Sequence, residues 1–486
     1  MRFSGKIVAL LMIVSLIVGA SGSYAALSFF GPEGHDGQKK IVKVDSSSPS
    51  GEVKKVRAIH DLIEKNYFKK VDEDKLYDGA IQGMIKALDD PFSTYMDPKT
   101  AKDFNQSLSS SFQGIGAEVR MVNNVVSIVA PIKGSPAEKA GLKPHDQIVT
   151  IDGKSTKGLS LYKAVNKIKG KKGTVVKLGV NRPGVTHTLT FEIKRGDIPL
   201  RTVKSKVIKE DNKQIGYINI TSFNANTDKE FNTELKKVED KGIDGLIIDV
   251  RGNPGGYLQA VESIAGQFIT KDKPIVQIED RNGKKERYFS SLEEKKPYPI
   301  AALIDNGSAS AAEILSAALN EAGGYPLIGT KSFGKGTVQQ GIEMSDNSEL
   351  KLTTFKWLTP DGNWIHKKGI KPTVKVKQPD YFYTTPITLD KGKVLGYDHT
   401  GTKIANAQKM LKGLGLNPGR VDGYYGEQTV KAVRAFQETN DLHVTGSINK
   451  KTAGKLQTGV IQAVDNPKND LQLKAAIKTL EKEMKS

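Results

Sequence analysis

The chain of 486 residues is too long for a single hydrophobic core, and typical domain sizes predict two to four domains. Its composition of 37% hydrophobic and 26% charged residues, without a cysteine, excludes a multi-span membrane protein, disulfides, thiolate catalysis and cysteine-based metal sites. The formal net charge of +19 is spread in short lysine pairs without an arginine-rich helix or zinc-finger spacing, which favours a wall or membrane surface over nucleic acid as partner.

Residues 1–30 are predicted to direct export. Arg2 and Lys6 precede an apolar run at 7–20, and Ser-Tyr-Ala at 23–25 has the small-x-small pattern of a signal-peptidase site. An uncleaved membrane anchor is the alternative, because no charge appears until Glu33. Both interpretations predict an extracytoplasmic protein, either secreted or anchored to the cell membrane by this segment. Residues 31–52 are polar and rich in turn formers, and are predicted to be a linker.

Residues 53–108 are predicted to form an N-terminal helical region. The apolar side chains of Val56, Ile59 and Ile63 recur at helical spacing, and Asp90-Pro91 ends the pattern. These apolar stripes have few obvious partners elsewhere in the chain. We therefore expect the region to support a homodimer.

Residues 109–197 change to short strands and glycine turns. One helix is predicted at 160–168, between strands at 147–151 and 175–180. The pattern predicts a compact domain that is mostly β.

Residues 198–380 alternate strands with helices. Strands are predicted at 245–250 and 300–304, and helices at 258–269 and 311–321. Such alternation predicts an α/β core with catalytic groups on loops at the strand ends.

Residues 381–398 are predicted to form a second linker. An internal near-repeat follows over residues 399–458. Val-Asp-Gly at 421–423 recurs as Val-Thr-Gly at 444–446, which predicts a small helical domain built from two similar turns. Residues 459–486 end in an amphipathic helix, whose apolar stripe we also expect to support dimerisation.

Three residues of the α/β core are candidates for catalysis. Ser310 lies where a strand leads into a helix, close to free backbone N–H groups that can stabilise an oxyanion, although an ordinary helix cap is the alternative. Lys335 lies between two glycines; it can act as a base only if burial lowers its pKa, and a solvent-facing lysine is the alternative. Gln339 is placed to hydrogen-bond the amine and hold it toward the serine.

Several ordered motifs over residues 53–378 resemble peptidase family S41, the carboxyl-terminal processing proteases. They are Leu-Asp-Asp-Pro-Phe-Ser-Thr-Tyr at 88–95, Ser-Ala-Ser at 308–310, Gly-Lys-Gly-Thr-Val-Gln at 334–339 and Thr-Pro-Asp-Gly at 359–362. The resemblance implies a serine-type endopeptidase with Ser310 as nucleophile, Lys335 as general base and Gln339 as the third residue. It also implies a multidomain α/β protein with an S41 protease core of the ClpP/crotonase-like kind.

The glycine-rich loop at 249–256 is the candidate for an oxyanion hole. The resemblance implies that Gly256, with Gly255 as the weaker candidate, supplies one backbone N–H and Ala311 the other. Without the other motifs, this loop would be an ordinary turn.

The loop Phe-Gln-Gly-Ile-Gly at 112–116 resembles the carboxylate-binding loop of PDZ domains, as do the motifs at 135–142 and 146–153. This resemblance implies that the N–H groups of Gly114, Ile115 and Gly116 bind the C-terminus of a peptide. Lys169 stands where the family often has an arginine thought to link the PDZ domain to the protease. The mode of regulation stays open for this reason.

The near-repeat at 399–458 resembles a peptidoglycan-binding domain, with a helical module for packing or dimerisation as the alternative. The seven histidines form no HExxH or close metal pair, so neither a metal nor another cofactor is expected, and His366 is interpreted as a surface histidine.

Together these observations predict an exported serine endopeptidase that recognises proteins by their C-termini through a PDZ domain. Its expected partners are such substrates, peptidoglycan and a second copy of the chain. A non-catalytic PDZ and cell-wall-binding scaffold is the main alternative, and an acyl-transfer enzyme with another class of substrate is the second. The joint presence of Ser310, Lys335 and Gln339 argues against a scaffold.

Overall fold

The computed structural model describes residues 51–122, 125–390 and 392–485. The predicted export segment at 1–30 and nearly all of the linker at 31–52 lie outside the described residues. In the part of the chain that the structure describes, no helix combines the length and the apolar character needed to cross a membrane.

The N-terminal region contains three helices and one short strand. The helices are α3 (Gly51–Asn66), α4 (Glu73–Lys86) and α5 (Pro98–Leu108), and the strand is β1 (Thr94–Met96). Asp72 and Asp97 cap α4 and α5 with their carboxylates. The sequence pattern did not indicate β1, which pairs with the long strand β18 (Glu349–Leu358) of the protease core.

The following β domain is built on a sheet of order β3-β4-β5-β7-β8, with β6 paired to β5. Its strands are β3 (Ala117–Val122), β4 (Val125–Pro131), β5 (Gln147–Ile151), β6 (Lys154–Ser155), β7 (Val175–Asn181) and β8 (Leu189–Lys194). Its helices are α6 (Pro136–Lys139) and α7 (Leu161–Ile168). The strands β2 (Ser111–Gly114) and β9 (Gly196–Pro199) pair where the chain enters and leaves this domain.

A six-stranded sheet of order β10-β11-β12-β15-β16-β19 forms the centre of the α/β core. The strands are β10 (Val203–Glu210), β11 (Lys213–Ile220), β12 (Gly245–Asp249), β15 (Ile300–Ile304), β16 (Leu327–Gly329) and β19 (Val374–Lys375). All pairs from β11 onward are parallel, so the carboxyl ends of β12 and β15 meet at one edge of the sheet.

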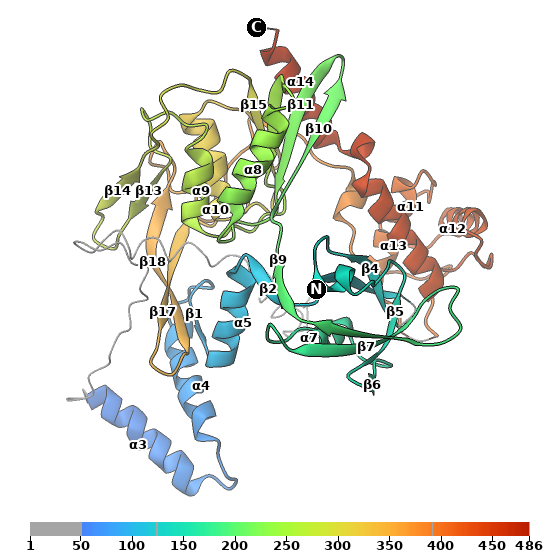
Figure 1. Ribbon diagram of the computed structural model, residues 1–486, viewed down its shortest axis with the longest axis horizontal. Coiled ribbons are helices and arrows are strands. Elements are labelled where there is room, and N and C mark those ends of the chain that lie inside the picture. The colour runs from blue at the N-terminus through green and yellow to red at the C-terminus, as the bar shows by residue number, and fades with distance from the viewer. Residues whose placement is uncertain (1–50, 123–124, 391, 486) are drawn as a thin grey trace.

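Helices cover both faces of this sheet, because side chains alternate between the faces along each strand. On one face, Leu246 and Ile248 of β12 pack with α8 (Thr227–Glu239), α9 (Leu258–Ala265) and α10 (Ala311–Ala317). On the other face, Ile247 packs with the last helix of the chain, α14 (Leu471–Glu483). Figure 1 shows α14 beside β15 and β11, on the side away from α9. The helix predicted at 258–269 is shorter and ends at Ala265.

A second sheet of order β1-β18-β13-β14, with β17 paired to β18, extends from the core toward the N-terminal helices. Its other strands are β13 (Val276–Glu279), β14 (Lys285–Tyr288) and β17 (Thr337–Glu343). Trp357 of β18 is fully buried in the core of the protease domain.

The C-terminal domain packs three helices around its own apolar core: α11 (Thr402–Gly413), α12 (Glu427–Thr439) and α13 (Lys450–Asp465). The chain enters through the 3-10 turn Asp380–Tyr383 and leaves through the turn Pro467–Asn469, which leads directly into α14. The multidomain α/β architecture with a C-terminal helical domain is therefore confirmed.

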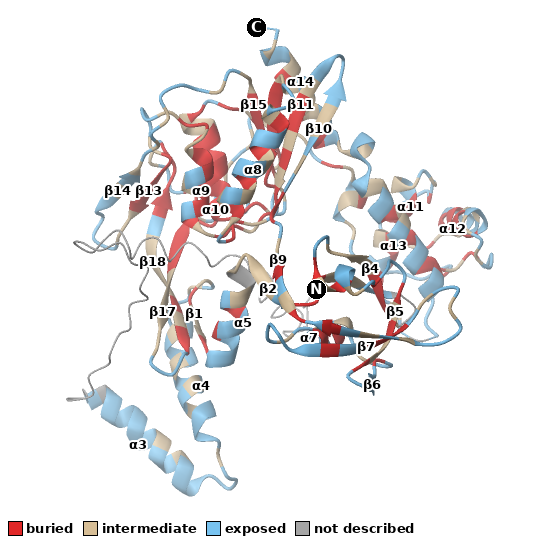
Figure 2. Cartoon of the chain, viewed as in Figure 1, coloured by how far each residue is buried: buried red, intermediate tan, exposed pale blue. Residues whose placement is uncertain are grey.

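The two apolar stripes expected to support dimerisation differ in the structure. Leu473, Ala476 and Leu480 of α14 are buried against the sheet of the same chain, so the C-terminal stripe is not free to bind a second copy. The stripe on α3 stays exposed, and Figure 2 shows this helix largely in the colour of exposed residues. The expectation was wrong for α14 because periodicity shows that one face is apolar but not what covers it.

Candidate active site

Ser310 occupies a strained backbone position between β15 and α10. Its φ of 54° and ψ of −116° are uncommon for a residue with a side chain, and such strain persists only where the surroundings impose it. The residue is the N-cap of α10 and is 9% exposed. The turn thus holds a serine hydroxyl at the first turn of a buried helix, where backbone N–H groups lack helical partners.

A buried carboxylate joins the serine turn to the lysine loop. Glu313, in the first turn of α10, accepts the N–H of Ser310 at 2.9 Å and the N–H of Lys335 at 2.8 Å. It also accepts the N–H of Gly334 and the hydroxyl of Ser332. Burial raises the pKa of Glu313, while these four hydrogen bonds act in the opposite direction. The carboxylate therefore fixes the two candidate catalytic segments relative to each other.

Lys335 is buried, with 3% of its surface exposed. Burial, followed by the nearby charge of Lys351, lowers the pKa of Lys335 to about 7 against the opposing effects of Asp90 and Glu313. Its amine lies 5.0 Å from the centre of the Phe92 ring, and its carbonyl accepts the indole N–H of Trp357. A substantial fraction of the amine is therefore neutral near pH 7, as a general base requires.

Gln339 lies in β17 next to a register shift in its pairing with β18. Its side-chain amide donates to the hydroxyls of Thr337 and Thr353 at 3.1 and 3.0 Å. With the nitrogen directed at these two hydroxyls, the carbonyl oxygen remains available as an acceptor.

A narrow pocket connects most of the predicted site residues. Its polar lining includes Ser310 and Gln339, and the two predicted oxyanion residues, Gly256 and Ala311, also line it. Its apolar walls are contributed by Leu258, Ile314, Val338 and Trp357. Lys335 belongs to the loop that Glu313 holds against the serine turn.

The glycine loop after β12 contributes Gly256 to the lining of the pocket. The N–H of Gly255 is used, because it donates to the side-chain oxygen of Asn253. The bridge between Phe223 and Gly256 uses the carbonyl of Gly255 and the N–H of Tyr257, so neither bond uses the N–H of Gly256. This geometry favours Gly256 over Gly255 as the candidate oxyanion donor.

Gly255 itself is required by close packing. Its φ is 111°, and an added Cβ would lie 2.9 Å from the Cβ of Ser310 and 2.9 Å from the carbonyl oxygen of Ala309. The glycine loop therefore lies directly against the serine turn.

The N-terminal motif at 88–95 contributes residues whose role the sequence did not indicate. The Asp90 carboxylate accepts the hydroxyl of Ser93 at 2.6 Å, and the Ser93 oxygen accepts the N–H of Thr353. Burial raises the pKa of Asp90, but hydrogen bonds led by that from Ser93 outweigh burial and lower it overall. The motif thus places a carboxylate and the Phe92 ring beside Lys335, and its similarity to the family signature was the only sequence signal.

His366, interpreted from the sequence as a surface histidine, is half-buried next to the lysine loop. Its Nδ1 lies 3.3 Å from the N–H of Gly336, and its ring stacks on Trp364. Burial lowers its pKa. These contacts make His366 a support for the loop around Lys335.

In the β domain, the predicted carboxylate-binding loop is tied down by the following motif. The side chain of Ile115 is buried in the domain core, and its carbonyl accepts the N–H of Ala137 at 2.7 Å. The hydroxyl of Ser135 donates to the carbonyl of Gly116, whose φ is 76°. Within the described residues β3 pairs only with β4, so its other edge can receive an extended peptide.

Lys169 lies close to the same loop. Its amine is 5.2 Å from the centre of the Phe112 ring, which places a cation beside the predicted carboxylate-binding residues.

One possible metal-binding cluster occurs in the described ranges, and it lies away from the catalytic segments in the sequence. It consists of His60, Asp61 and Glu64 on α3. The side chains of Asp61 and Glu64 are exposed, and such acidic groups are common without an ion.

Four family models match parts of the chain. "Peptidase family S41" matches residues 214–376, and "PDZ domain" matches 106–181. "Activating protease CtpB N-terminal domain" matches 16–100, and "Putative peptidoglycan binding domain" matches 400–456.

Curated relatives are similar over nearly the whole chain. The carboxy-terminal processing protease CtpB of Bacillus subtilis is 49% identical over 478 residues, covering 98% of this chain and 99% of the relative. The carboxy-terminal processing protease CtpA of the same organism is 45% identical over 474 residues, again covering 98% and 99%. Among solved structures, a photosystem II D1 C-terminal processing protease is 26% identical, covers 68% of this chain and 94% of its own, and has a TM-score of 0.41.

Proposed function

The chain is a serine-type protease of peptidase family S41, the carboxy-terminal processing proteases, and from this premise we propose that Ser310, Lys335 and Gln339 form its catalytic centre. The observation that carries the proposal is the burial of Lys335, with its pKa lowered to about 7, in a loop that Glu313 joins to the Ser310 turn. The family membership decides against a scaffold without catalysis.

The proposed reaction begins with neutral Lys335. Its amine takes the proton of the Ser310 hydroxyl while the serine oxygen attacks the carbonyl carbon of the peptide bond. The N–H groups of Gly256 and Ala311 stabilise the oxyanion that forms. The lysine then gives its proton to the leaving amine, and water repeats the sequence on the acyl-enzyme.

Gln339 acts on this reaction through orientation. Its nitrogen is held by two threonine hydroxyls, so its oxygen is the end that can accept a hydrogen bond from the lysine amine. Such a contact would align Lys335 with the serine without taking part in bond making.

We further propose that the PDZ domain recognises substrates by their C-termini. An extended peptide would add to the free edge of β3, with its carboxylate at the N–H groups of Gly114, Ile115 and Gly116. The tethering of this loop by Ser135 and Ala137 supports the proposal, because a fixed loop loses little entropy when it binds.

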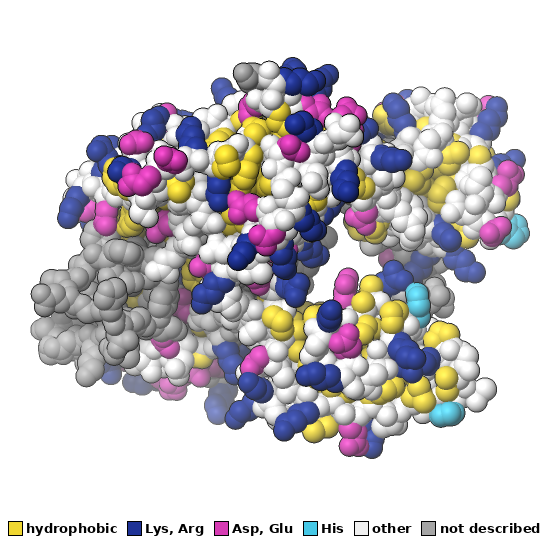
Figure 3. All heavy atoms as spheres, turned by 45° about the horizontal axis from the view of Figure 1, so that its top comes forward, with side chains coloured by type: hydrophobic (Ala, Val, Ile, Leu, Met, Phe, Trp, Pro, Cys, Tyr) yellow, Lys and Arg dark blue, Asp and Glu magenta, His cyan; other side chains and the backbone are white. Residues whose placement is uncertain are grey.

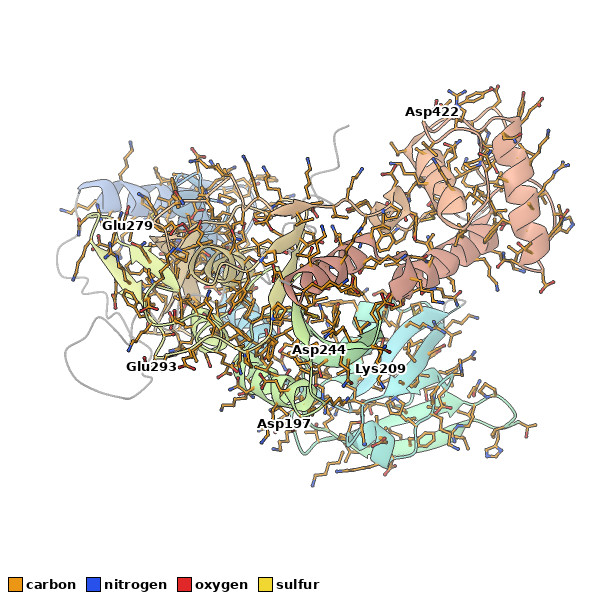
Figure 4. All side chains as sticks on the ribbon, turned by 90° about the horizontal axis from the view of Figure 1, so that it is seen from above. Asp197, Lys209, Asp244, Glu279, Glu293 and Asp422 are labelled. Atoms are coloured by element: carbon orange, nitrogen blue, oxygen red, sulfur yellow. The ribbon has the colours of Figure 1, made fainter. Side chains whose placement is uncertain are left out.

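The proposed location is outside the cytoplasm, in the cell envelope. The match to a peptidoglycan-binding domain and the similarity to carboxy-terminal processing proteases support this location. We propose that the N-terminal segment directs export and that the C-terminal domain binds peptidoglycan. Figure 3 shows basic side chains spread over the visible face rather than gathered in one block, which suits a polyanionic surface. Asp422, labelled in Figure 4, pairs with Arg420 in the C-terminal helical domain, apart from the protease core.

The experiment that tests the catalytic centre uses the full chain and an unfolded protein substrate, with fragments identified by mass spectrometry. Ser310→Ala and Lys335→Ala are each expected to abolish cleavage while the far-ultraviolet circular dichroism stays unchanged. Two variants serve as matched controls and should retain cleavage. Ser316→Ala changes another serine of the helix that Ser310 caps, and Lys331→Ala changes an exposed lysine four residues before Lys335. Near-normal cleavage by either of the first two variants would refute the proposed pair.

A further inference from the structure

Arg251, five residues before Gly256, joins the glycine loop to the end of the chain. Its guanidinium is mostly buried, with 16% of the side chain exposed, and every donor nitrogen is engaged. Nε and Nη2 donate to Asp249, the last residue of β12. Nη1 and Nη2 donate to the two carboxylate oxygens of Asp470 at 3.0 and 2.8 Å, and Nη1 also donates to Gln472 at 2.9 Å.

Asp470 is fixed from the other side as well. It is the N-cap of α14 and accepts the N–H of Leu473 at 2.9 Å. The side-chain amide of Gln378, at the end of the protease core, donates to Asp470 at 2.6 Å and accepts the N–H of Leu471. The chain enters the C-terminal domain just after Gln378 and leaves it at Asp470, so both connections meet at one cluster around Arg251.

The helix that carries Asp470 is part of the protease core. Leu473, Ala476 and Leu480 cover the face of the central sheet opposite α8, α9 and α10. Gly245, which begins β12, lies so close to α14 that an added Cβ would be 2.6 Å from the terminal carbon of Met484. The last helix therefore packs along the strand whose carboxyl end leads into the glycine loop, and Figure 4 shows it between the core and the C-terminal helices.

The glycine loop is anchored at several places along its length, among them the bonds of Gly255 and Tyr257 to Phe223 and the bond of the Asn253 side chain to the carbonyl of Ile220. On the side of the serine turn, the N–H of Gly252 donates to Asp305 at 2.8 Å, and the carbonyl of Asn253 accepts the N–H of Ala309. At the start of the loop, the bonds of the Arg251 side chain to Asp249, Asp470 and Gln472 add a further anchor. If the anchor to Asp470 is lost, the guanidinium keeps only one carboxylate and the loop start can shift.

We propose that Asp470 is a positioning residue for catalysis: through Arg251 it holds the loop that presents the Gly256 N–H to the oxyanion. The C-terminal helix is then needed for turnover and not only for stability. This inference rests on the proposed function, because it assumes that the Gly256 N–H stabilises an oxyanion formed on attack by Ser310. Asp470 touches no reacting atom, so its effect is exerted entirely through the arginine.

The test measures kcat and KM of the full chain on a short chromogenic peptide. Asp470→Asn is expected to lower kcat by about ten- to a hundred-fold, because a small displacement of an oxyanion donor weakens only the transition state. KM should stay within about twofold, which separates a catalytic effect from lost substrate binding. Asp470→Glu keeps the charge and should recover most of the kcat. Asp465→Asn removes an exposed carboxylate from the end of α13 and should leave kcat unchanged.

A double-mutant cycle gives a second, independent measurement. If Asp470 acts through Arg251, the double variant Arg251→Gln/Asp470→Asn should lose about as much kcat as one single variant, not the product of the two losses. Thermal melting shows whether each variant is folded at the assay temperature. If the Asp470→Asn variant is unfolded at that temperature, Gln472→Ala takes its place. This variant removes one bond to Arg251 and should lower kcat severalfold at constant KM.

Two results would overturn the inference: wild-type kcat in a folded Asp470→Asn or Gln472→Ala variant, or losses that multiply in the cycle. Ser310→Ala, assayed in parallel, keeps the two proposals distinguishable. If it remains active, the proposed function is wrong; if it is inactive while Asp470→Asn is fully active, only the role of Asp470 is wrong.

Discussion

Two lysines share a buried region of the protease core. Burial lowers the pKa of Lys351 to about 8, and the charge of Lys351 in turn contributes to lowering the pKa of Lys335 to about 7. Since only neutral Lys335 can accept the serine proton, kcat should rise with pH through about 7 and level off above it.

Replacing Lys351 tests the electrostatic part of this explanation. Lys351→Met removes a like charge, so the pKa of Lys335 should rise and the pH–rate profile should move to higher pH. Lys356→Met removes an exposed lysine from the same strand and should leave the midpoint in place. A rate that does not change from pH 6 to 9 in the wild type would argue against a lysine base.

At the scale of single residues, Glu313 holds the Ser310 turn and the Lys335 loop together. In Glu313→Gln an amide nitrogen replaces one carboxylate oxygen. Since this nitrogen can only donate, it loses either the bonds from the N–H groups of Ser310 and Lys335 or those from Ser332 and Gly334. We expect this variant to lose about 1–3 kcal/mol of unfolding free energy and most of its activity.

The pH dependence of the remaining activity separates positioning from general damage. The charge of Glu313 raises the pKa of Lys335, so its removal should shift the rate profile to lower pH. Ser332→Ala removes one of the four hydrogen bonds to the carboxylate, together with the bond that the Ser332 oxygen accepts from the N–H of Ile370, without changing the charge. It should reduce stability less and leave the midpoint unshifted. An unshifted midpoint in Glu313→Gln would contradict the assigned electrostatic role.

At the scale of elements, α3 and α4 expose several large apolar side chains. Val56 is 57% exposed, Leu62 61% and Met84 65%, whereas the corresponding side chains of α14 are buried against the chain's own sheet. Exposed apolar surface of this kind favours an interface, and we propose that α3 and α4 bind a second copy of the chain.

Light scattering on the full chain tests this interface. A dimer mass is expected at tens of micromolar, and Leu62→Glu should convert it to a monomer because a charge cannot be buried there without a partner. Ile461→Glu changes an equally exposed residue of α13 and should leave the dimer intact. A monomer mass for the wild type would refute the dimer.

At the scale of the whole molecule, the proposed reading of C-termini requires the β domain and the protease core to act on one substrate. Amidation of the C-terminus of a good peptide substrate removes the carboxylate and leaves the scissile bond unchanged. Cleavage should fall about tenfold or more, since hydrogen bonds to a charged group contribute about 1.5–3 kcal/mol.

A control for this prediction is a peptide too short to occupy the edge of β3 and the pocket at Ser310 together. Its cleavage should not depend on amidation, because it cannot use both sites. Equal rates for the amidated and free long peptides would show that the loop at Gly114, Ile115 and Gly116 does not read a carboxylate.

The amino-acid sequence by itself was sufficient to determine the family, the α/β class of the core and the candidates Ser310, Lys335 and Gln339. These conclusions depend on short motifs and on periodicity, which are local properties of the chain. The strand at 245–249 and the helix capped at Ser160 were predictable for the same reason.

Only the tertiary structure decided which distant segments surround the candidate catalytic residues. Glu313 bonds to backbone groups 21 and 22 residues away, and Arg251 meets Asp470 across 219 residues. No local pattern encodes such contacts, because a carboxylate has the same propensity whether it is solvated or buried against a loop. For the same reason the apolar stripe of α14 suggested an interface, while the folded chain uses it to cover its own sheet and so brings Asp470 to Arg251 in the glycine loop.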